Sequence, residues 1–75
     1  MHIFAQRKMI FDIEQFSKDI KRKRYFKSRT LKYVGKETGV SFAVISRVER
    51  GQVPNIETFT KLCTWLGEES NRYFK

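Results

Sequence analysis

The chain has 75 residues and a formal net charge of +8, from 16 lysine and arginine residues against 8 aspartate and glutamate residues. This length suits one small domain, the single cysteine excludes an internal disulfide, and cysteine and histidine show no zinc-ligand spacing. No apolar run approaches the roughly 20 residues of a membrane span and no secretory signal pattern is present, so we expect a cytoplasmic protein without metal or cofactor.

The positive charge is concentrated between residues 18 and 36, where Asp19 is the only acidic residue. Lysine and arginine residues that neutralise phosphates release condensed counterions, which gives such a stretch affinity for nucleic acid. The alternative is a solvated basic surface that only keeps the protein soluble. Charge alone leaves both interpretations open.

Residues 1–11 show no clear helical or strand periodicity, and we predict that they form an N-terminal arm. Asp12 is a suitable N-cap for the helix that follows. Apolar residues then recur at spacings of three and four, at Ile13, Phe16 and Ile20. This pattern predicts a first helix over about residues 13–27.

Two short helices are predicted next. Thr30 is a suitable N-cap for a helix that ends at Gly39, where the left-handed backbone conformation favours glycine. Ser41 can cap a third helix that runs to about Arg50 and is ended by Gly51. On the inward faces of these two helices we expect Leu31, Val34, Ile45, Val48 and Glu49.

A fourth helix is predicted after the turn at Pro54, and Gly67 ends it. Its apolar stripe consists of Ile56, Phe59, Leu62, Cys63 and Leu66. Residues 68–75 are expected to add one short helix, with Tyr73 and Phe74 folded back onto the core. No alternating β-branched run lies between hairpin turns, so we predict an all-α chain of about five helices.

The second and third helices, with the tight turn between them, have the length of a helix-turn-helix, TLKYVGKETGVSFAVISRVERG, over residues 30–51. This sequence resembles the Cro and phage-repressor family, the XRE type of helix-turn-helix DNA-binding domain, over about residues 16–67. The matching residues are Ile20, Arg24, Leu31, Val34, Gly39, Val40, Ser41, Ile45, Ser46, Glu49, Gly51, Pro54, Leu62, Leu66 and Gly67. The resemblance implies a compact five-helix lambda-repressor-like DNA-binding domain over residues 12–75, with the helix-turn-helix at its second and third helices.

One residue departs from the family pattern, because Gly35 stands where the family usually has alanine. A small residue is needed there, where the second helix crosses the third. Glycine costs a helix about 1 kcal/mol relative to alanine, and we expect no effect on the crossing itself.

The resemblance implies base contacts from the outer face of the third helix, at Phe42, Ala43, Val44 and Arg47. Arg47 is the strongest candidate, because a guanidinium can bind O6 and N7 of guanine with two hydrogen bonds. The other three side chains can contact only thymine methyl groups or sugars. The alternative is that Phe42 and Val44 belong to the edge of the core and that Arg47 binds a phosphate.

The resemblance also implies phosphate contacts from the N-terminal parts of the second and third helices, and nearby cations extend this set. The expected phosphate-binding residues are Lys27, Arg29, Thr30, Lys32, Lys36, Ser41, Ser46 and Arg50. The basic run from Lys21 to Arg24 lies behind the reading unit, and some of its charges are expected only to steer the approach to DNA.

The resemblance further pairs Arg24 of the first helix with Glu49 near the end of the third. We expect this ion pair to be structural, since the loss of one partner of a buried pair leaves an uncompensated charge. The alternative is a helix-end glutamate in water.

Trp65, Tyr73 and Phe74 are expected to form an exposed aromatic patch that serves as a dimer or partner surface. For Trp65, the alternative is that it completes the core. Domains of the family bind as dimers to half-sites about 34 Å apart, which implies a homodimer on palindromic double-stranded DNA. Arg7 and Lys8 of the arm could contact the DNA or a second subunit, and the sequence leaves both open.

These features predict a sequence-specific DNA-binding transcriptional regulator, a repressor that acts by promoter occlusion. An enzyme is not expected, because the only histidine, His2, lies in the arm and no paired carboxylates or phosphate-binding loop are evident. The alternative is a protein-interaction module, such as an antitoxin that binds a toxin and regulates its own gene. A basic amphipathic helix over residues 13–27 that binds a membrane surface or a calmodulin-like partner is a third hypothesis, but it leaves the signals after Ser28 unexplained.

Overall fold

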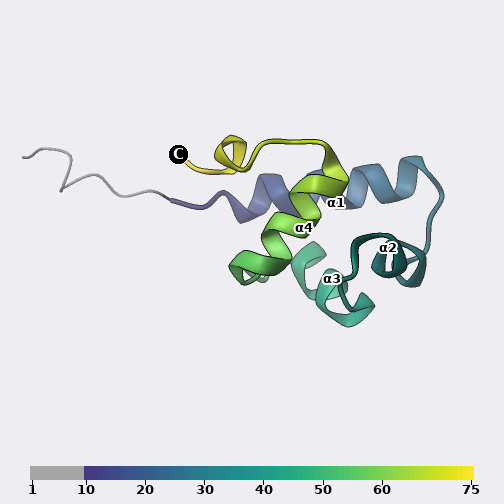
Figure 1. Cartoon of the computed structure of the whole chain (residues 1–75). Helices are drawn as coiled ribbons and strands as arrows, with labels where there is room; N and C mark the ends of the chain where they lie inside the picture. The colour runs from purple at the N-terminus through teal and green to yellow at the C-terminus, as the bar shows by residue number, and fades with distance from the viewer. Residues whose placement is uncertain (1–9) are drawn as a thin grey trace, which may run out of the picture.

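A computed structural model of the chain describes residues 10–75, which form four α-helices and one 3₁₀ helix (Figure 1). These elements are α1 (Ile13–Phe26), α2 (Leu31–Thr38), α3 (Phe42–Glu49), α4 (Ile56–Leu66) and the 3₁₀ helix η2 (Ser70–Tyr73). The predicted all-helical class is confirmed for the described residues. The expected fifth helix is only a short 3₁₀ segment, so a count of five α-helices is not confirmed. Most of the predicted arm, with His2, Arg7 and Lys8, lies outside the described residues.

Local hydrogen bonds set the ends of the helices. The capping side chains are those of Asp12, Thr30, Ser41 and Asn55, each of which accepts a hydrogen bond from a backbone N–H of the first turn. Gly39 and Gly67 end α2 and α4 in the left-handed conformation, with φ of 78° and 75°. The sequence predicts these start and stop signals because each depends on neighbouring residues alone.

One core joins the helices, and its buried apolar residues are Phe16, Ile20, Val34, Val40, Ile45, Val48, Phe59, Leu62, Cys63 and Tyr73. Ile45 and Val48 anchor α3 from behind, as predicted. Ile56 does not belong to the predicted stripe, because it is the first residue of α4 and its side chain is exposed beyond the edge of the core. Burial raises the pKa of the Cys63 thiol to about 11, so the thiol is neutral at physiological pH.

The two ends of the described chain meet, and we call this region, residues 10–12 and 68–75, the terminal closure. Phe11 and Phe74 form an antiparallel bridge, and the Asp12 N–H donates to the carbonyl oxygen of Tyr73 at 2.6 Å. Five aromatic rings pack around this bridge, and those in contact have centroids 4.9 to 6.2 Å apart. They belong to Phe11 and Phe74 of the terminal closure, to Tyr73 beside them, and to Phe16 and Phe59 of the helices. Figure 1 shows the yellow C-terminal segment running back along α1, away from α3.

The position of Tyr73 corrects one prediction and confirms another. Tyr73 folds back onto the core, as expected, but it is fully buried and so cannot belong to an exposed aromatic patch. Its ring packs against that of Phe16 with centroids 4.9 Å apart. Phe74 is half-buried and packs against the same core. Burial of an aromatic ring is favourable in a core this small.

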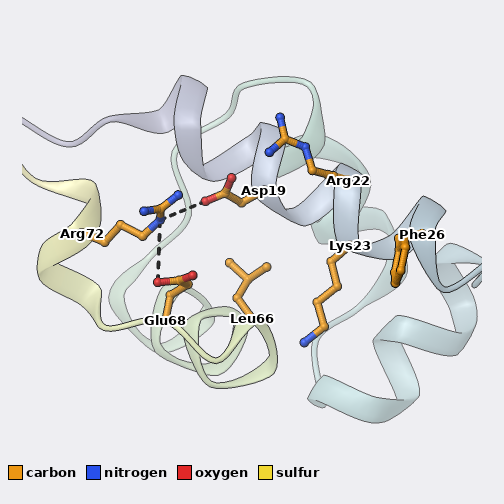
Figure 2. Close-up of a pocket in the computed structure, with 7 residues that line it drawn as sticks. All are labelled: Asp19, Arg22, Lys23, Phe26, Leu66, Glu68 and Arg72. Atoms are coloured by element: carbon orange, nitrogen blue, oxygen red, sulfur yellow. Dashed lines mark hydrogen bonds and ion pairs between the residues drawn. The ribbon is translucent and has the colours of Figure 1, made fainter.

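Asp19 connects α1 to the terminal closure through a network of hydrogen bonds. Its carboxylate accepts from the Tyr73 hydroxyl at 2.7 Å, from Gln15 Nε2 at 2.7 Å and from Arg72 Nε at 3.2 Å. Burial opposes ionisation of this carboxyl, but the three hydrogen bonds outweigh that effect and hold the pKa of Asp19 below its usual value. Figure 2 shows the Arg72 guanidinium between the carboxylates of Asp19 and Glu68, at the side of a hollow of about 400 Å³.

Candidate nucleic-acid interface

The helix-turn-helix unit consists of α2, α3 and the turn between them. Gly39 ends α2 with φ of 78°, and Ser41 caps α3 two residues later. Because Ile45 and Val48 face the core, the opposite face of α3 is turned outward. Figure 1 shows α2 and α3 together on the side of the molecule away from the C-terminal segment.

Gly35 has a role that helix propensity does not reveal. A Cβ atom at this position would lie 2.8 Å from the carbonyl oxygen of Val40 and 3.5 Å from the backbone nitrogen of Phe42. Glycine therefore allows the backbone of α2 to approach the turn and the start of α3 more closely than alanine would. Alanine, the residue that the family usually has here, would force the crossing of this chain to widen.

The outer face of α3 carries the predicted base-reading residues in different environments. Arg47 is exposed and Phe42 is 49% exposed. Ala43 is half-buried. Val44 is half-buried and packs against the core, which is the arrangement described by the alternative interpretation of that residue. Arg47 and Phe42 are thus the most accessible of the four.

A hollow of about 610 Å³ joins α2 to the start of α3, and we call it the α2–α3 hollow. Its lining residues are Thr30, Lys32, Tyr33, Gly35, Lys36, Val40 and Phe42. It brings together two hydroxyl groups, two ammonium groups and two aromatic rings. The Lys32 ammonium lies 5.7 Å from the centre of the Phe42 ring. Four of the residues named as DNA contacts in the sequence therefore share one concave surface.

The hydroxyl groups of Thr30 and Ser41 already act within the fold. The Thr30 hydroxyl oxygen accepts from the Tyr33 N–H at 3.1 Å, and that of Ser41 accepts from the Ala43 N–H at 3.2 Å. A hydroxyl that accepts at a helix start can still donate its own proton, for example to a phosphate oxygen. Capping and phosphate binding are therefore compatible roles.

The other predicted phosphate contacts are spread more widely. Lys27 and Arg29 are exposed in the segment between α1 and α2, close in sequence to the α2–α3 hollow. Ser46 is half-buried on α3. Arg50 lines a separate hollow with Lys18, Lys21 and other residues. The structure thus does not bring Arg50 into the group formed by Lys32 and Lys36.

Arg24 and Glu49 form a bidentate ion pair that ties α1 to the last residue of α3. Arg24 Nε lies 2.6 Å from Glu49 Oε2, and Arg24 Nη2 lies 2.8 Å from Oε1. The two side chains are only 11% and 7% exposed, so the alternative of a solvated Glu49 does not hold. The hydrogen bonds to Glu49 raise the pKa of Arg24 above its usual value. Arg24 Nη1 also donates to the carbonyl oxygen of Arg29 at 3.1 Å.

Trp65 lies half-buried between helices and is not part of an open aromatic patch. Its indole N–H donates to Glu37 at 3.1 Å, and the Lys23 ammonium lies 4.9 Å from the centre of its ring. Lys23 also donates to the backbone carbonyl of Trp65. These contacts agree with the alternative in which Trp65 completes the core.

Tyr33 is a candidate contact that the sequence interpretation missed. Its ring lies in the α2–α3 hollow, and the Arg29 guanidinium lies 4.3 Å from the ring centre. Helical spacing does not signal this contact, because Arg29 precedes the N-cap Thr30 and lies outside α2. An aromatic ring beside a guanidinium is a common partner for nucleic acid.

The comparisons with known proteins point to the same part of the chain. A family model described as helix-turn-helix, of the XRE type, matches residues 20–69, which is more than half of the sequence. The search of curated proteins and the search of solved structures give no match. Within residues 10–75, no helix combines the length and the apolar character needed to cross a bilayer.

Proposed function

The chain belongs to the XRE family of helix-turn-helix DNA-binding regulators, and from that premise we propose that it binds a specific duplex operator and represses transcription by covering a promoter. In this proposal α3 enters the major groove. The observation that carries it is the orientation of α3: Ile45 and Val48 are buried, whereas Arg47 and Phe42 are open to solvent.

We propose that Arg47 reads guanine through O6 and N7, because its guanidinium is exposed on the outer face of α3. Phe42 and Ala43 can contact thymine methyl groups at the start of the same helix. Val44 is the weakest candidate, since part of its side chain already packs on the core.

We propose that the α2–α3 hollow follows the DNA backbone. Lys32, Lys36 and Thr30 supply its donors, and the Phe42 ring faces the bases. The further proposed phosphate contacts are Lys27, Arg29, Ser41, Ser46 and Arg50. The DNA-binding domain was expected to span residues 12–75 with residues 1–11 as an arm, and in this proposal it also includes Ile10 and Phe11, which pair and pack with the C-terminal segment. Two copies bind a palindromic site in the cytoplasm.

The test begins by selecting preferred sites from random duplexes with the whole chain and measuring affinity at several salt concentrations. Arg47→Ala is expected to lose about 1 to 3 kcal/mol of discrimination at one guanine position. Arg22→Ala, which removes the same charge from an exposed position on α1, serves as the matched control and should keep the sequence preference. If Arg47→Ala discriminated between bases as well as the wild type does, α3 would not be the reading helix in the way proposed.

A second candidate function is a partner-binding regulator of the antitoxin kind, and an exposed residue favours it. Phe26 lies at the end of α1 and lines the hollow of Figure 2, together with Arg22 and Lys23. Its test is whether the chain relieves growth inhibition by a protein encoded beside it. Phe26→Ala should remove that relief while DNA binding persists.

A further inference from the structure

Phe26 is the most exposed of the large hydrophobic side chains of residues 10–75, at 88%. The other exposed aromatic side chains, those of Tyr25, Tyr33 and Phe42, each have a cation 4.3 to 5.7 Å from the ring centre. Phe26 has neither such a cation nor a ring partner within this part of the chain. A single exposed ring is ordinary on a protein surface, so the surroundings of Phe26 must show whether it has a role.

Phe26 lines the hollow of about 400 Å³ shown in Figure 2, which we call the Phe26 hollow. Leu66, the last residue of α4, lines the same hollow, and most of the lining is apolar. Leu66 is half-buried and packs against the core, so the fold holds it in place. The hollow therefore offers an apolar side chain of another molecule contact with both a ring and a branched aliphatic group.

One side of the Phe26 hollow carries charges that are already paired. The Arg72 guanidinium lies 3.2 Å from the carboxylate of Asp19 and 3.7 Å from that of Glu68, and Figure 2 shows it between them. Asp19 also accepts from the Tyr73 hydroxyl at 2.7 Å. These groups stabilise the terminal closure, and their charges largely offset one another.

The other side carries two cations without acidic partners. Arg22 and Lys23 precede Phe26 by four and three residues on α1, so each neighbours Phe26 on the surface of the helix. Among residues 10–75, no carboxylate pairs with either cation. Arg22 is exposed, and Lys23 donates to the backbone carbonyl of Trp65. A carboxylate placed beside Phe26 can therefore accept charge-assisted hydrogen bonds from Arg22.

We propose that the Phe26 hollow binds a short acidic segment of a partner protein, in which an apolar side chain and a carboxylate lie next to each other. The apolar side chain contacts Phe26 and Leu66, and the carboxylate binds Arg22. This inference deepens the second candidate function and rests on it for the biological partner, because it states the chemistry that the partner must present. It does not depend on the proposal that α3 reads DNA.

The same charges argue against a nucleic acid as the occupant. Duplex DNA carries a negative charge about every 1.7 Å along its axis, so it would bring phosphates to Asp19 and Glu68 as well as to Arg22. A peptide can place its carboxylate at Arg22 and an apolar side chain beside Leu66. The hollow also lies between α1 and the segment that follows α4, on the side away from α3 (Figure 1). Partner and DNA can therefore bind at the same time.

The first experiment selects ligands from a display library of short random peptides with the whole chain immobilised. The selected peptides should carry aspartate or glutamate within about one helical turn of leucine, isoleucine or an aromatic residue. Replacing that acidic residue by its amide should weaken binding at least about tenfold, measured by fluorescence anisotropy of the labelled peptide. Because the hollow is small compared with a stable interface of about 800 Å² per partner, we expect affinities in about the micromolar range.

Two substitutions test the site, and each has a matched control. Phe26→Ala changes no charge and should weaken binding of the selected peptides at least about tenfold, whereas Ile56→Ala, at a 74% exposed residue of α4, should leave it unchanged. Arg22→Gln should have an effect of similar size. Lys21→Gln removes the same charge from the adjacent exposed residue, outside the Phe26 hollow, and should weaken binding less than about twofold. Circular dichroism checks that all four variants fold.

The amide signals of the isotope-labelled chain in nuclear magnetic resonance spectra locate the bound peptide independently of any variant. Titration should move the signals of residues 22–26 and 66–72 and leave those of α3 in place. Movement confined to α2 and α3 would mean that the peptide follows the surface proposed for DNA through its negative charge, and it would overturn the inference. A selection that enriches no such peptide, or equal affinity for the wild type and Phe26→Ala, would also overturn it.

These outcomes are distinct from those of the second candidate function. If the selected peptides bound the Phe26 hollow but the chain relieved no growth inhibition, the antitoxin role would fail and the inference would stand with a different partner. If Phe26→Ala removed the relief of growth inhibition while no acidic peptide bound, the second candidate function would stand and this inference would fail. Phe26→Ala should in either case keep the wild-type affinity for the selected duplex. A loss of that affinity would assign the hollow to DNA and overturn the inference.

Discussion

The helix-turn-helix unit is stabilised by aliphatic side chains and one ion pair, whereas the terminal closure depends on packed aromatic rings. In the first region, Ile45 and Val48 fill the space behind α3, and Arg24 binds Glu49. In the second, the Tyr73 ring packs against Phe16 and the Tyr73 hydroxyl donates to Asp19. These contacts connect segments of the chain that lie far apart in sequence. Local capping signals thus set the helix ends of the region proposed to read DNA, whereas the region that closes the molecule depends on long-range contacts throughout.

The two regions differ in which substitutions they tolerate. The terminal closure lies away from α3, so its side chains can change without altering the surface proposed to face DNA. The helix-turn-helix unit has no such freedom, because the residues that position α3 also maintain the core. Mutations in the terminal closure should therefore change stability and leave DNA affinity unchanged, whereas mutations in the helix-turn-helix unit should change both.

The largest effect is expected from Glu49→Ala, which leaves the guanidinium of Arg24 buried without its partner. Breaking a buried ion pair in this way costs about 3 to 5 kcal/mol. Small domains are stable by only about 5 to 15 kcal/mol, so the variant should be largely unfolded at moderate temperature, in both regions at once. Urea unfolding followed by Trp65 fluorescence measures the loss.

The control for that experiment is Glu57→Ala. Glu57 is exposed on α4 and pairs with Lys61 one turn later at 3.4 Å, an arrangement that contributes about 0.3 to 0.5 kcal/mol. An unfolding midpoint for Glu49→Ala equal to that of Glu57→Ala would show that the buried pair does not stabilise the fold.

Gly35→Ala should have the next largest effect, of about 1 to 3 kcal/mol, the usual cost of overpacking. Helix propensity alone predicts the opposite, a gain of up to about 1 kcal/mol. The introduced methyl group would meet the Val40 carbonyl oxygen at 2.8 Å, so the turn must shift. Because that turn sets the start of α3, DNA affinity should fall together with stability. Thr64→Ala, at an exposed position of α4, is the control and should change stability little.

The sequence predicts the helix boundaries and the inner face of α3 correctly because these depend on residues a few positions apart. Thr30 and Ser41 accept the capping hydrogen bonds that their types suggest. It could not predict that a Cβ at position 35 would meet the Val40 carbonyl or that Ile56 is exposed, and for Tyr73 it offered both the core and an exposed patch, since the finished packing decides each of these. In the candidate site, the sequence predicted that Arg47 is exposed, but it did not predict that Tyr33 lies beside Arg29.

Tyr73→Phe tests how much one hydrogen bond of the terminal closure contributes to stability. The substitution keeps the buried ring and removes the hydrogen bond from its hydroxyl to Asp19, which measures 2.7 Å. A hydrogen bond to a charged group contributes about 1.5 kcal/mol or somewhat more, and Gln15 and Arg72 continue to donate to the carboxylate. The melting temperature should fall modestly while affinity for the selected duplex stays the same. A loss of DNA affinity of comparable size would contradict the functional separation of the two regions.

The smallest effect is expected in the pH dependence of stability, and it concerns Asp19. Its pKa is lower in the folded chain than in the unfolded chain, where an aspartate titrates near about 3.9. The contribution of the ionised carboxylate is therefore complete above that pH and disappears as the pH falls through the lower folded-state value. Asp19→Asn lacks this contribution, so the difference in melting temperature between the wild type and the variant should be greatest near neutrality and shrink below about pH 4. Melting curves from neutral to strongly acidic buffer measure that difference. If it were equal at every pH, the network would stabilise the terminal closure through shape alone, and the charge of Asp19 would contribute nothing.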